Sequence, residues 1–190
     1  PFLFETLVGA VAIQTTRSPA GDIIAAFTSV APRVAPFEPA VFDALMNLLG
    51  LSDADLDAGY PPMLAFAGNW HPLLVLRERT TFDGFSFDPQ AVRALMDANG
   101  WAGTVMVAFA MSPRVFEVRN LFPVGDIIED PATGSAAAAL GGYLRVTAAL
   151  DAPTHIEVHQ GAHVGRPSLL AVEIPVTGGI IVSGSASPIV

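Results

Sequence analysis

Residues 134–143 read GSAAAALGGY and directly follow a short turn, EDPAT, at residues 129–133. The alanine-rich run predicts a helix over about residues 133–147, because alanine has the highest helix propensity. Its side chains are small enough for other segments to pack closely against the backbone, so we expect this helix to be buried. The rest of the chain must then be arranged around it.

The start of this helix is a candidate anion site. The first backbone N–H groups of a helix lack partners within the helix and lie at the positive end of its dipole. Thr133 or Ser135 could cap them, or a ligand carboxylate or phosphate could bind there. A well-capped core helix without a ligand explains the same residues, and the spacing leaves both interpretations open.

The composition argues against several classes of function. A formal net charge of −9 with only 9 Lys+Arg offers no basic surface for nucleic acid. Cysteine is absent, which removes disulfides, thiolate metal sites and thiol catalysis. Neither a continuous apolar run of about 20 residues nor a basic and apolar leader is visible, so we expect a cytoplasmic protein with no membrane partner.

The remaining chain reads as many short strands and a few helices. Apolar spacing and the stops at Gly50 and Gly100 predict helices over about residues 39–49 and 88–99. Apolar runs between turns predict strands at residues 2–8, 10–16, 22–28, 63–67, 72–77, 104–110, 115–119, 156–159, 169–174 and 179–183. The proline-rich residues 31–39 are expected to cross between two structural units. We therefore expect an α+β fold in which a curled antiparallel sheet surrounds the alanine-rich helix.

Four motifs occur in a defined order. They are AGNWH at residues 67–71, VRNLFP at 118–123, EDPATGSA at 129–136, and QG at 160–161 followed by GRPS at 165–168. Together they resemble the phenazine-biosynthesis PhzF-like family, relatives of diaminopimelate epimerase, over roughly residues 3–185.

The resemblance implies the diaminopimelate epimerase-like fold, an antiparallel barrel-like sheet wrapped around a central helix, once per domain. It assigns residues 1–33 to the last strands of a truncated N-terminal domain. Residues 34–190 would form the C-terminal domain, and their final strands could return to the N-terminal one.

The resemblance also implies an isomerase that moves a proton within a small carboxylated substrate and uses no cofactor. In the family, a carboxylate in a Ser-Glu-Thr segment of the first domain is thought to carry that proton. Phe4-Glu5-Thr6 is similar but lies on a later hairpin, so that role is not transferred to Glu5. We expect these 190 residues to bind substrate without turnover and to pair as a homodimer or with their own N-terminal half. The alternative is a non-catalytic binding or structural module on the same fold.

The resemblance places Asp130, Gly134 and Ser135 near substrate, with Asp130 as the candidate catalytic carboxylate. Considered on its residues alone, Asp130 could instead stabilise the turn by accepting backbone N–H bonds. Diaminopimelate epimerase uses two cysteines, one of them in the turn that corresponds to residues 133–135. A serine stands in that turn here, and its hydroxyl is too weakly acidic to exchange a carbon-bound proton unaided, which excludes the two-thiol mechanism.

Asn69 and Arg119 are the other candidate substrate contacts. The amide of Asn69 could bind a ligand carboxylate or amine, or could simply form the turn. Arg119 could bind a substrate carboxylate with two hydrogen bonds, but pairing with Glu117 or Asp126 would explain it equally well. We expect His71 to be structural.

Two further chemistries are disfavoured. His155, Glu157 and His159 alternate along one strand and could hold a metal, but a solvated strand face is the commoner arrangement, so we expect no metal. A Ser-His-Asp hydrolase built on Ser135 lacks a Gly-x-Ser-x-Gly elbow, and no histidine is near that turn in the sequence.

Overall fold

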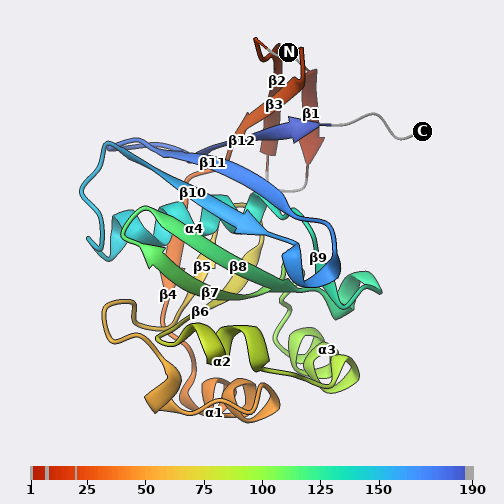
Figure 1. The fold of residues 1–190 in the computed structure, drawn as a ribbon, viewed down its shortest axis with the longest axis vertical. Helices are drawn as coiled ribbons and strands as arrows, with labels where there is room; N and C mark the ends of the chain where they lie inside the picture. The colour runs from red at the N-terminus through yellow and green to blue at the C-terminus, as the bar shows by residue number, and fades with distance from the viewer. Residues whose placement is uncertain (1, 7–8, 20, 187–190) are drawn as a thin grey trace.

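The computed structural model describes residues 2–6, 9–19 and 21–186, and residues 7 and 8 of the expected strand 2–8 lie outside this range. Within it, the chain folds into one large sheet with helices on both of its faces (Figure 1). The strands are β1 (Phe2–Thr6), β2 (Gly9–Arg17), β3 (Ile23–Thr28), β4 (Arg33–Ala35), β5 (Met63–Phe66), β6 (Trp70–Leu76), β7 (Val105–Ser112), β8 (Val115–Leu121), β9 (Glu129–Asp130), β10 (Thr154–Gln160), β11 (Ser168–Ile174) and β12 (Ile181–Ala186). The helices are α1 (Pro39–Leu48), α2 (Arg79–Gly84), α3 (Pro89–Ala98) and α4 (Gly134–Val146), with short 3₁₀ turns η1 (Asp53–Asp55), η2 (Pro123–Gly125) and η3 (Ala162–Val164).

The expected α+β class is confirmed, but the sheet is mixed rather than antiparallel. Its strand order is β1-β2-β3-β12-β11-β10-β8-β7-β6-β5-β4, and β9 pairs with β8 outside this path. Two neighbouring pairs, β6 with β7 and β10 with β8, run parallel. They are parallel because long connections, each containing a helix, separate β6 from β7 and β8 from β10. The sheet is also not closed, since β1 and β4 stand at opposite ends of the described path.

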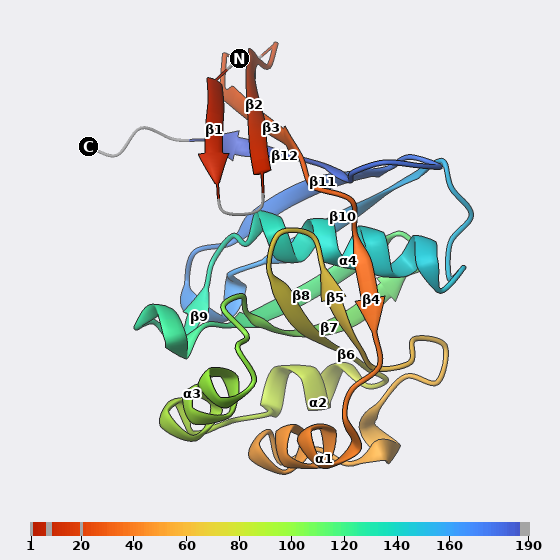
Figure 2. The ribbon, with the colours of Figure 1, turned by 180° about the vertical axis from the view of Figure 1, so that it is seen from behind.

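Helix α4 lies in the hollow of this sheet, as Figure 2 shows from behind. Its segment from Ala136 to Leu144 is entirely buried. The small residues are required for close packing: a Cβ added to Gly142 would lie 2.3 Å from Pro32 Cβ, and one added to Gly141 would lie 3.0 Å from Val172 Cγ1. The prediction of a buried small-residue helix surrounded by the sheet is confirmed.

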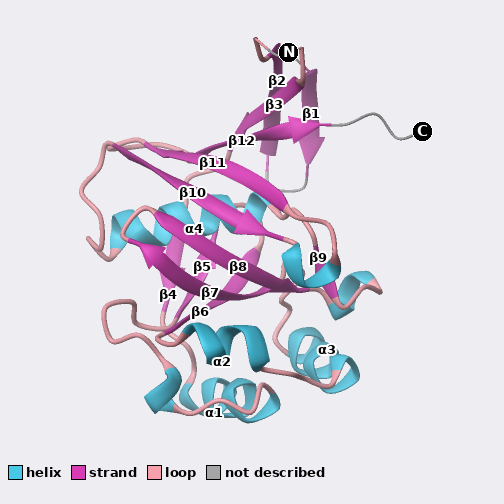
Figure 3. Ribbon diagram, in the orientation of Figure 1, coloured by secondary structure: helices cyan, strands magenta, loops and turns pink. Residues whose placement is uncertain are grey.

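The sheet separates two apolar cores, because successive residues of a strand point to opposite faces. On β7, Met106 and Ala108 pack in the core that contains α4, whereas Val105 and Val107 pack in the core that contains α1 and α3. Figure 3 shows α1, α2 and α3 grouped on the side of the sheet opposite α4. The start of α3 follows the expected pattern, with Asp88 accepting a hydrogen bond from the Gln90 N–H at 2.9 Å.

Strands β1, β2, β3 and β12 form an arm that extends away from this core (Figure 1). β12 pairs with β11 on one side and with β3 on the other, so the last strand joins the arm to the core sheet. Every residue of β1 is exposed, and the exposed fractions of Phe2, Leu3 and Phe4 are 62%, 69% and 52%. The expected boundary between an N-terminal domain ending at residue 33 and a C-terminal domain beginning at residue 34 stays a prediction.

Candidate functional site

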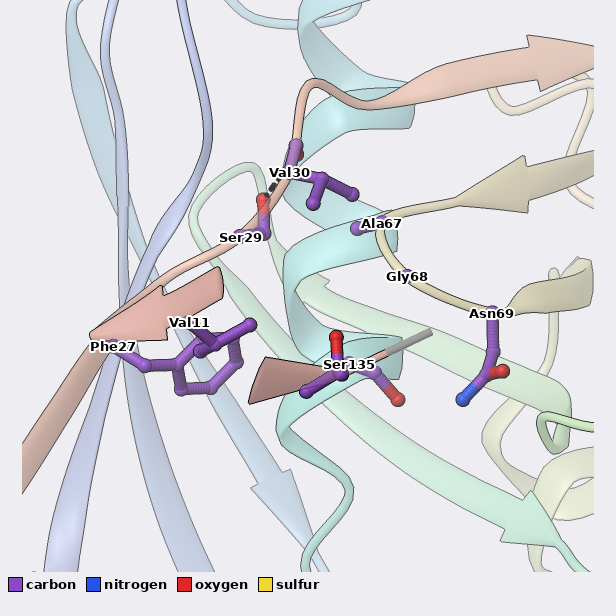
Figure 4. A pocket seen from close by; sticks show the side chains of 9 residues that line it. Val11, Phe27, Ser29, Val30, Ala67, Gly68, Asn69 and Ser135 are labelled. Atoms are coloured by element: carbon purple, nitrogen blue, oxygen red, sulfur yellow. Dashed lines mark hydrogen bonds between the residues drawn. The ribbon is translucent and has the colours of Figure 1, made fainter. Parts of the chain in front are cut away.

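A cavity of about 400 Å³ lies where the arm meets the start of α4. Its lining comes from the arm, from the segment leading to β4, from the turn between β5 and β6, and from α4. The lining residues are Thr6, Val11, Phe27, Ser29, Val30, Ala67, Gly68, Asn69 and Ser135. Figure 4 shows Asn69 and Ser135 extending into the same space from two different elements. The cavity therefore brings together two of the residues that the sequence singled out.

The start of α4 differs from the expected capping arrangement. Thr133 occupies the N-cap position but makes no side-chain capping bond. Its hydroxyl instead donates to Asp130 Oδ2 at 2.6 Å, and its backbone N–H donates to Gln160 Oε1 at 3.2 Å. The Ser135 hydroxyl is engaged with His71. The expectation that Thr133 or Ser135 caps the helix by its side chain is therefore wrong, because both hydroxyls are used elsewhere.

Ser135 is held by a histidine that is distant in the sequence. His71 Nε2 lies 3.1 Å from Ser135 Oγ. The histidine ring is fully buried, and this burial lowers the pKa of His71 to about 4. The imidazole is therefore neutral at pH 7 and carries one ring proton.

The backbone of Thr104 indicates which ring nitrogen carries that proton. The Thr104 N–H donates to His71 Nδ1 at 3.0 Å, and its direction is fixed by the peptide. The Thr104 carbonyl oxygen also lies 3.2 Å from Nδ1 and would accept a proton carried there. Because the Thr104 N–H is directed at Nδ1 and the contact is shorter, we infer that Nδ1 is the acceptor, so the proton is on Nε2 and is donated to Ser135 Oγ. Ser135 then keeps its own hydroxyl proton for a ligand in the cavity. No motif in the sequence links His71 to Ser135; only the folded chain brings them together.

Asp130 is not one of the residues that line the cavity. It is half-buried in β9, and its side chain accepts the Thr133 hydroxyl rather than the backbone N–H groups of an Asx turn. Its carbonyl oxygen accepts a hydrogen bond of 2.5 Å from Gln160 Nε2. Gln160 is 2% exposed and also donates to Thr133 Oγ1 at 2.9 Å, so one buried amide fixes the whole turn. The QG motif is the sequence signal for this contact, but its partner could not be identified from sequence.

Arg119 is placed away from the cavity. Its guanidinium pairs with the buried carboxylate of Glu129 at 2.5 Å and donates to the carbonyl oxygens of Phe82 and Phe85, both at 3.2 Å. It also packs over the Phe85 ring at 3.9 Å. The neighbouring acid is thus Glu129, not Glu117 or Asp126, which pair with Arg79 and Arg93. With these partners around it, we do not include Arg119 among the proposed ligand contacts.

Gly134, the first residue of α4, lies where Phe27 of the arm packs against the helix. A Cβ at this position would lie 2.8 Å from Cε1 of Phe27, which belongs to β3 and lines the cavity. The absence of a side chain therefore lets the Phe27 ring approach the start of α4. Gly134 shapes one wall of the cavity through this contact.

The polar strand face at residues 154–160 shows no metal geometry. His159 Nε2 lies 3.8 Å from Glu157 Oε2, and both side chains are exposed to solvent. Within the described part of the chain, no three His, Asp or Glu side chains are gathered closely enough to hold a metal ion. Among the same residues, no helix is both long and apolar enough to cross a membrane.

The chain is similar in sequence to several known isomerases. An uncharacterized isomerase of Escherichia coli K12, YddE, is 25% identical over 158 residues, which cover 80% of this chain and 53% of that protein. A trans-2,3-dihydro-3-hydroxyanthranilate isomerase of Pseudomonas fluorescens is 30% identical over 167 residues, covering 87% of this chain and 55% of that protein. The chain thus spans about half the length of the curated relatives it matches.

A solved structure supports the same fold. The predicted epimerase of Pseudomonas aeruginosa aligns with a TM-score of 0.77 and 24% identity, over 97% of this chain and 62% of that one. This likeness confirms the expected epimerase-like fold. The family model for phenazine biosynthesis-like proteins matches residues 2–189. The chain therefore belongs to the phenazine biosynthesis-like, or PhzF, family.

Proposed function

We propose that this chain supplies the substrate-binding wall of an isomerase that moves a proton within a small carboxylated metabolite. The observation that carries the proposal is the convergence of Asn69 and Ser135 in one cavity at the start of α4. The Ser135 hydroxyl and the Asn69 amide offer hydrogen-bond donors, and the nearby helix terminus favours negative charge. Gly134 contributes by letting Phe27 close the wall.

Moving a proton at carbon requires a side chain that is in the correct protonation state at the working pH: a base must be free of its proton, and an acid must carry one. Neutral His71 has a pKa of about 4 and is engaged with Ser135, whose own hydroxyl is too weakly acidic to act alone. Within this chain, we propose Asp130 as the candidate catalytic carboxylate, since it is tied to the turn that enters α4. We propose that a second group comes from additional polypeptide; the curated relatives are about twice as long as the part of them that matches this chain. No cofactor is part of the proposed reaction.

The proposal includes an assembly. The exposed strand β1 would pair with a second copy or with an N-terminal half of the same polypeptide, and the protein would work in the cytoplasm. The relative from Pseudomonas fluorescens suggests cyclic acids such as trans-2,3-dihydro-3-hydroxyanthranilate for a first substrate panel.

Deuterium incorporation tests the proposal. A panel of small carboxylic acids is incubated in heavy water with the 190-residue chain and with a longer polypeptide that contains it, and the products are followed by NMR and mass spectrometry. We expect cofactor-independent isomerisation with solvent deuterium in the product for the longer polypeptide only. Asp130→Asn in the longer polypeptide should lower the rate by about 10²–10⁴-fold, the usual contribution of a positioned acid or base. Equal rates for both polypeptides would show that the chain needs no group from elsewhere.

A non-catalytic binding module is the second candidate. It is favoured by one observation, that Asp130 is not among the residues lining the cavity. In that case, both polypeptides bind the same acids and neither exchanges deuterium.

A further inference from the structure

The QG and GRPS motifs, which join β10 to β11, meet the turn at residues 129–133 in space. The Ser168 hydroxyl donates to the Pro131 carbonyl oxygen at 2.7 Å. Gly161 approaches the same carbonyl so closely that an added Cβ would lie 2.7 Å from its oxygen. The connection between β10 and β11 is therefore packed against the turn that carries the candidate carboxylate, although the proposed function assigns these two motifs no role.

Gln160 uses every polar group of its side chain in this turn. Its Oε1 accepts the Thr133 N–H at 3.2 Å, while its Nε2 donates to the Asp130 carbonyl oxygen at 2.5 Å and to Thr133 Oγ1 at 2.9 Å. The residue is 2% exposed, so water has little access to these bonds. A reversed carboxamide would place two oxygens together at Asp130 and two N–H groups together at Thr133, so the contacts fix which end of the side chain is the donor.

The hydrogen bonds that lead from Gln160 to the Asp130 side chain have one direction. Thr133 Oγ1 accepts a proton from Gln160, and its own proton is donated to Asp130 Oδ2 at 2.6 Å. An ionised carboxylate can only accept, and hydrogen bonds to a charged acceptor are stronger than neutral ones. The donors therefore follow the order Gln160, Thr133, Asp130, and they hold one oxygen of the carboxylate.

The second oxygen of the carboxylate, Asp130 Oδ1, is left open. Among the described residues, the Asp130 side chain makes a hydrogen bond only through Oδ2. Proton transfer depends on how exactly the reacting group is placed and oriented. Because Oδ2 is held by Thr133, Oδ1 is the atom that can exchange a proton with a substrate, and its direction is restricted.

We propose that Gln160 is a positioning residue of this site, which acts through the Thr133 hydroxyl to hold Asp130 in one side-chain rotamer with Oδ1 open for proton transfer. The inference rests on the proposed function, because it takes Asp130 as the carboxylate that moves the proton. Gln160 and Thr133 keep their own protons and touch no reacting atom.

The rotamer of Asp130 tests the proposal on the 190-residue chain without any ligand. Three-bond NMR couplings from Asp130 Cγ to the backbone nitrogen and carbonyl carbon report whether one staggered rotamer or several are populated. We expect one rotamer in the parent protein and in Thr133→Ser, which keeps the hydroxyl. Thr133→Val and Gln160→Met each break the chain of donors and should give averaged couplings. Valine has nearly the shape of threonine, so Thr133→Val stays informative where Gln160→Met disturbs folding.

Ser168→Ala separates the effect of these donors from a general loosening of the turn. Ser168 binds the Pro131 carbonyl oxygen but makes no hydrogen bond with the Asp130 side chain. Its replacement should therefore lower stability and leave Asp130 in one rotamer. Gln90→Met makes the same chemical change as Gln160→Met at an exposed position in α3, and it should change neither the couplings nor the stability.

Kinetics of the longer polypeptide show whether the rotamer matters for the reaction. With trans-2,3-dihydro-3-hydroxyanthranilate as the probe, Thr133→Val should lower kcat by about 10²-fold, the effect of a misplaced reacting group. KM should be unchanged, because kcat and kcat/KM fall together when an interaction matters only in the transition state. Thr133→Ser should retain most of the parent rate.

The outcomes separate this inference from the proposed function. One unchanged rotamer in both Thr133→Val and Gln160→Met overturns the positioning role and leaves the proposed function standing. Averaged couplings in Ser168→Ala as well also overturn it, because the turn as a whole would then hold Asp130. Averaged couplings with an unchanged kcat show that the rotamer has no part in the reaction. If Asp130→Asn keeps the full rate, the proposed role of Asp130 fails even where the couplings change as expected.

Discussion

The Nε2 atom of His71 lies 3.1 Å from Ser135 Oγ, although 64 positions separate the two residues in the chain. The contact is continued on the other side of the ring, where Nδ1 meets Thr104 and the Thr104 hydroxyl donates to Asn120 Oδ1 at 2.6 Å. Asn120 in turn is the register partner of Asp130. Polar contacts thus run from Ser135 at the start of α4 through His71 of β6 and Thr104 to Asn120 of β8, the strand that pairs with β9.

Burial of His71 makes the stability of the fold depend on pH. Its pKa is about 4 in the folded protein, below the ordinary value of 6.5, so the unfolded chain binds more protons between these two values. Stability is therefore complete above about pH 6.5 and falls as pH decreases toward 4. Between pH 7 and pH 5, His71 alone should lower the free energy of unfolding by about 2 kcal/mol.

Urea unfolding at the two pH values measures this loss. His71→Gln should be less stable at pH 7 but should show a smaller loss on acidification, whereas His155→Gln, at an exposed position, should behave like the parent. A nitrogen-15 NMR titration of His71 with a midpoint near 6.5 would contradict the prediction. The same spectra report whether the ring proton is on Nε2.

The buried pair of Arg119 and Glu129 should be essential for stability. Removing one partner leaves the other charge buried without its counterion, which typically costs about 3–5 kcal/mol. Glu129→Gln is therefore expected to lower the free energy of unfolding by that order. Arg77→Gln provides the control, because Arg77 and Glu78 form an exposed pair 3.5 Å apart, and such pairs are worth about 0–1 kcal/mol.

The variant Arg119→Gln shows whether Arg119 stabilises the fold or binds a ligand. A large loss of stability with unchanged affinity for the panel of small carboxylic acids, measured on the folded fraction, supports the structural role. If the variant kept its stability and lost ligand binding, Arg119 would have to be returned to the binding residues.

Because Pro32 lies close to α4, we expect replacement of Gly142 by alanine to destabilise the protein rather than stabilise it. In a helix interior, Gly→Ala normally stabilises by about 1 kcal/mol. At Gly142 the added methyl would meet Pro32 Cβ at 2.3 Å, so Gly142→Ala should instead destabilise by about 1–3 kcal/mol, the usual cost of overpacking. Gly84→Ala is the matched control, because an added Cβ there meets nothing within 4 Å. Thermal unfolding of both variants checks the sign, and a stabilised Gly142→Ala would show that Pro32 can move away without loss.

The apolar edge strand β1 should mediate association. Light scattering coupled to gel filtration should give a mass that rises above 19.8 kDa with concentration. Leu3→Lys, at the most exposed of the three large apolar residues of the strand, should abolish the rise, since charged residues protect open strand edges. Val176→Lys introduces the same charge at an exposed loop position and should have no effect. A constant monomer mass in the parent protein would show that the edge is tolerated without a partner.

The sequence was sufficient for the features that depend on local chemistry. The buried helix at residues 134–146 followed from its alanines, and the start of α3 followed from Asp88 and Pro89. Most strands were also located, because their apolar runs end at turn residues. The short strand β4 was missed inside the proline-rich crossing, and α2 was missed because its six residues are too few for a periodic pattern.

The remaining features depend on contacts between distant segments. The parallel pairing of β6 with β7 could not be predicted from the sequence, because an apolar run looks the same whether its strand pairs in parallel or antiparallel. The partners of Ser135 and Arg119 could not be found by spacing either. Glu129 was part of the recognised motif, but whether an acid faces a ligand or an arginine is decided by the fold around it. Gln160 shows the same limit, since its three contacts with the turn at 130–133 are all long-range.

The wall contributed by Phe27 makes the arm and the cavity thermodynamically interdependent. Phe27 is carried by β3, yet its ring rests at the start of α4 beside Gly134. Any molecule that docks on the arm and changes the position of this ring must change ligand affinity, and a bound ligand must change docking by the same factor. The change in docking affinity caused by a ligand and the change in ligand affinity caused by docking then both measure the same coupling free energy.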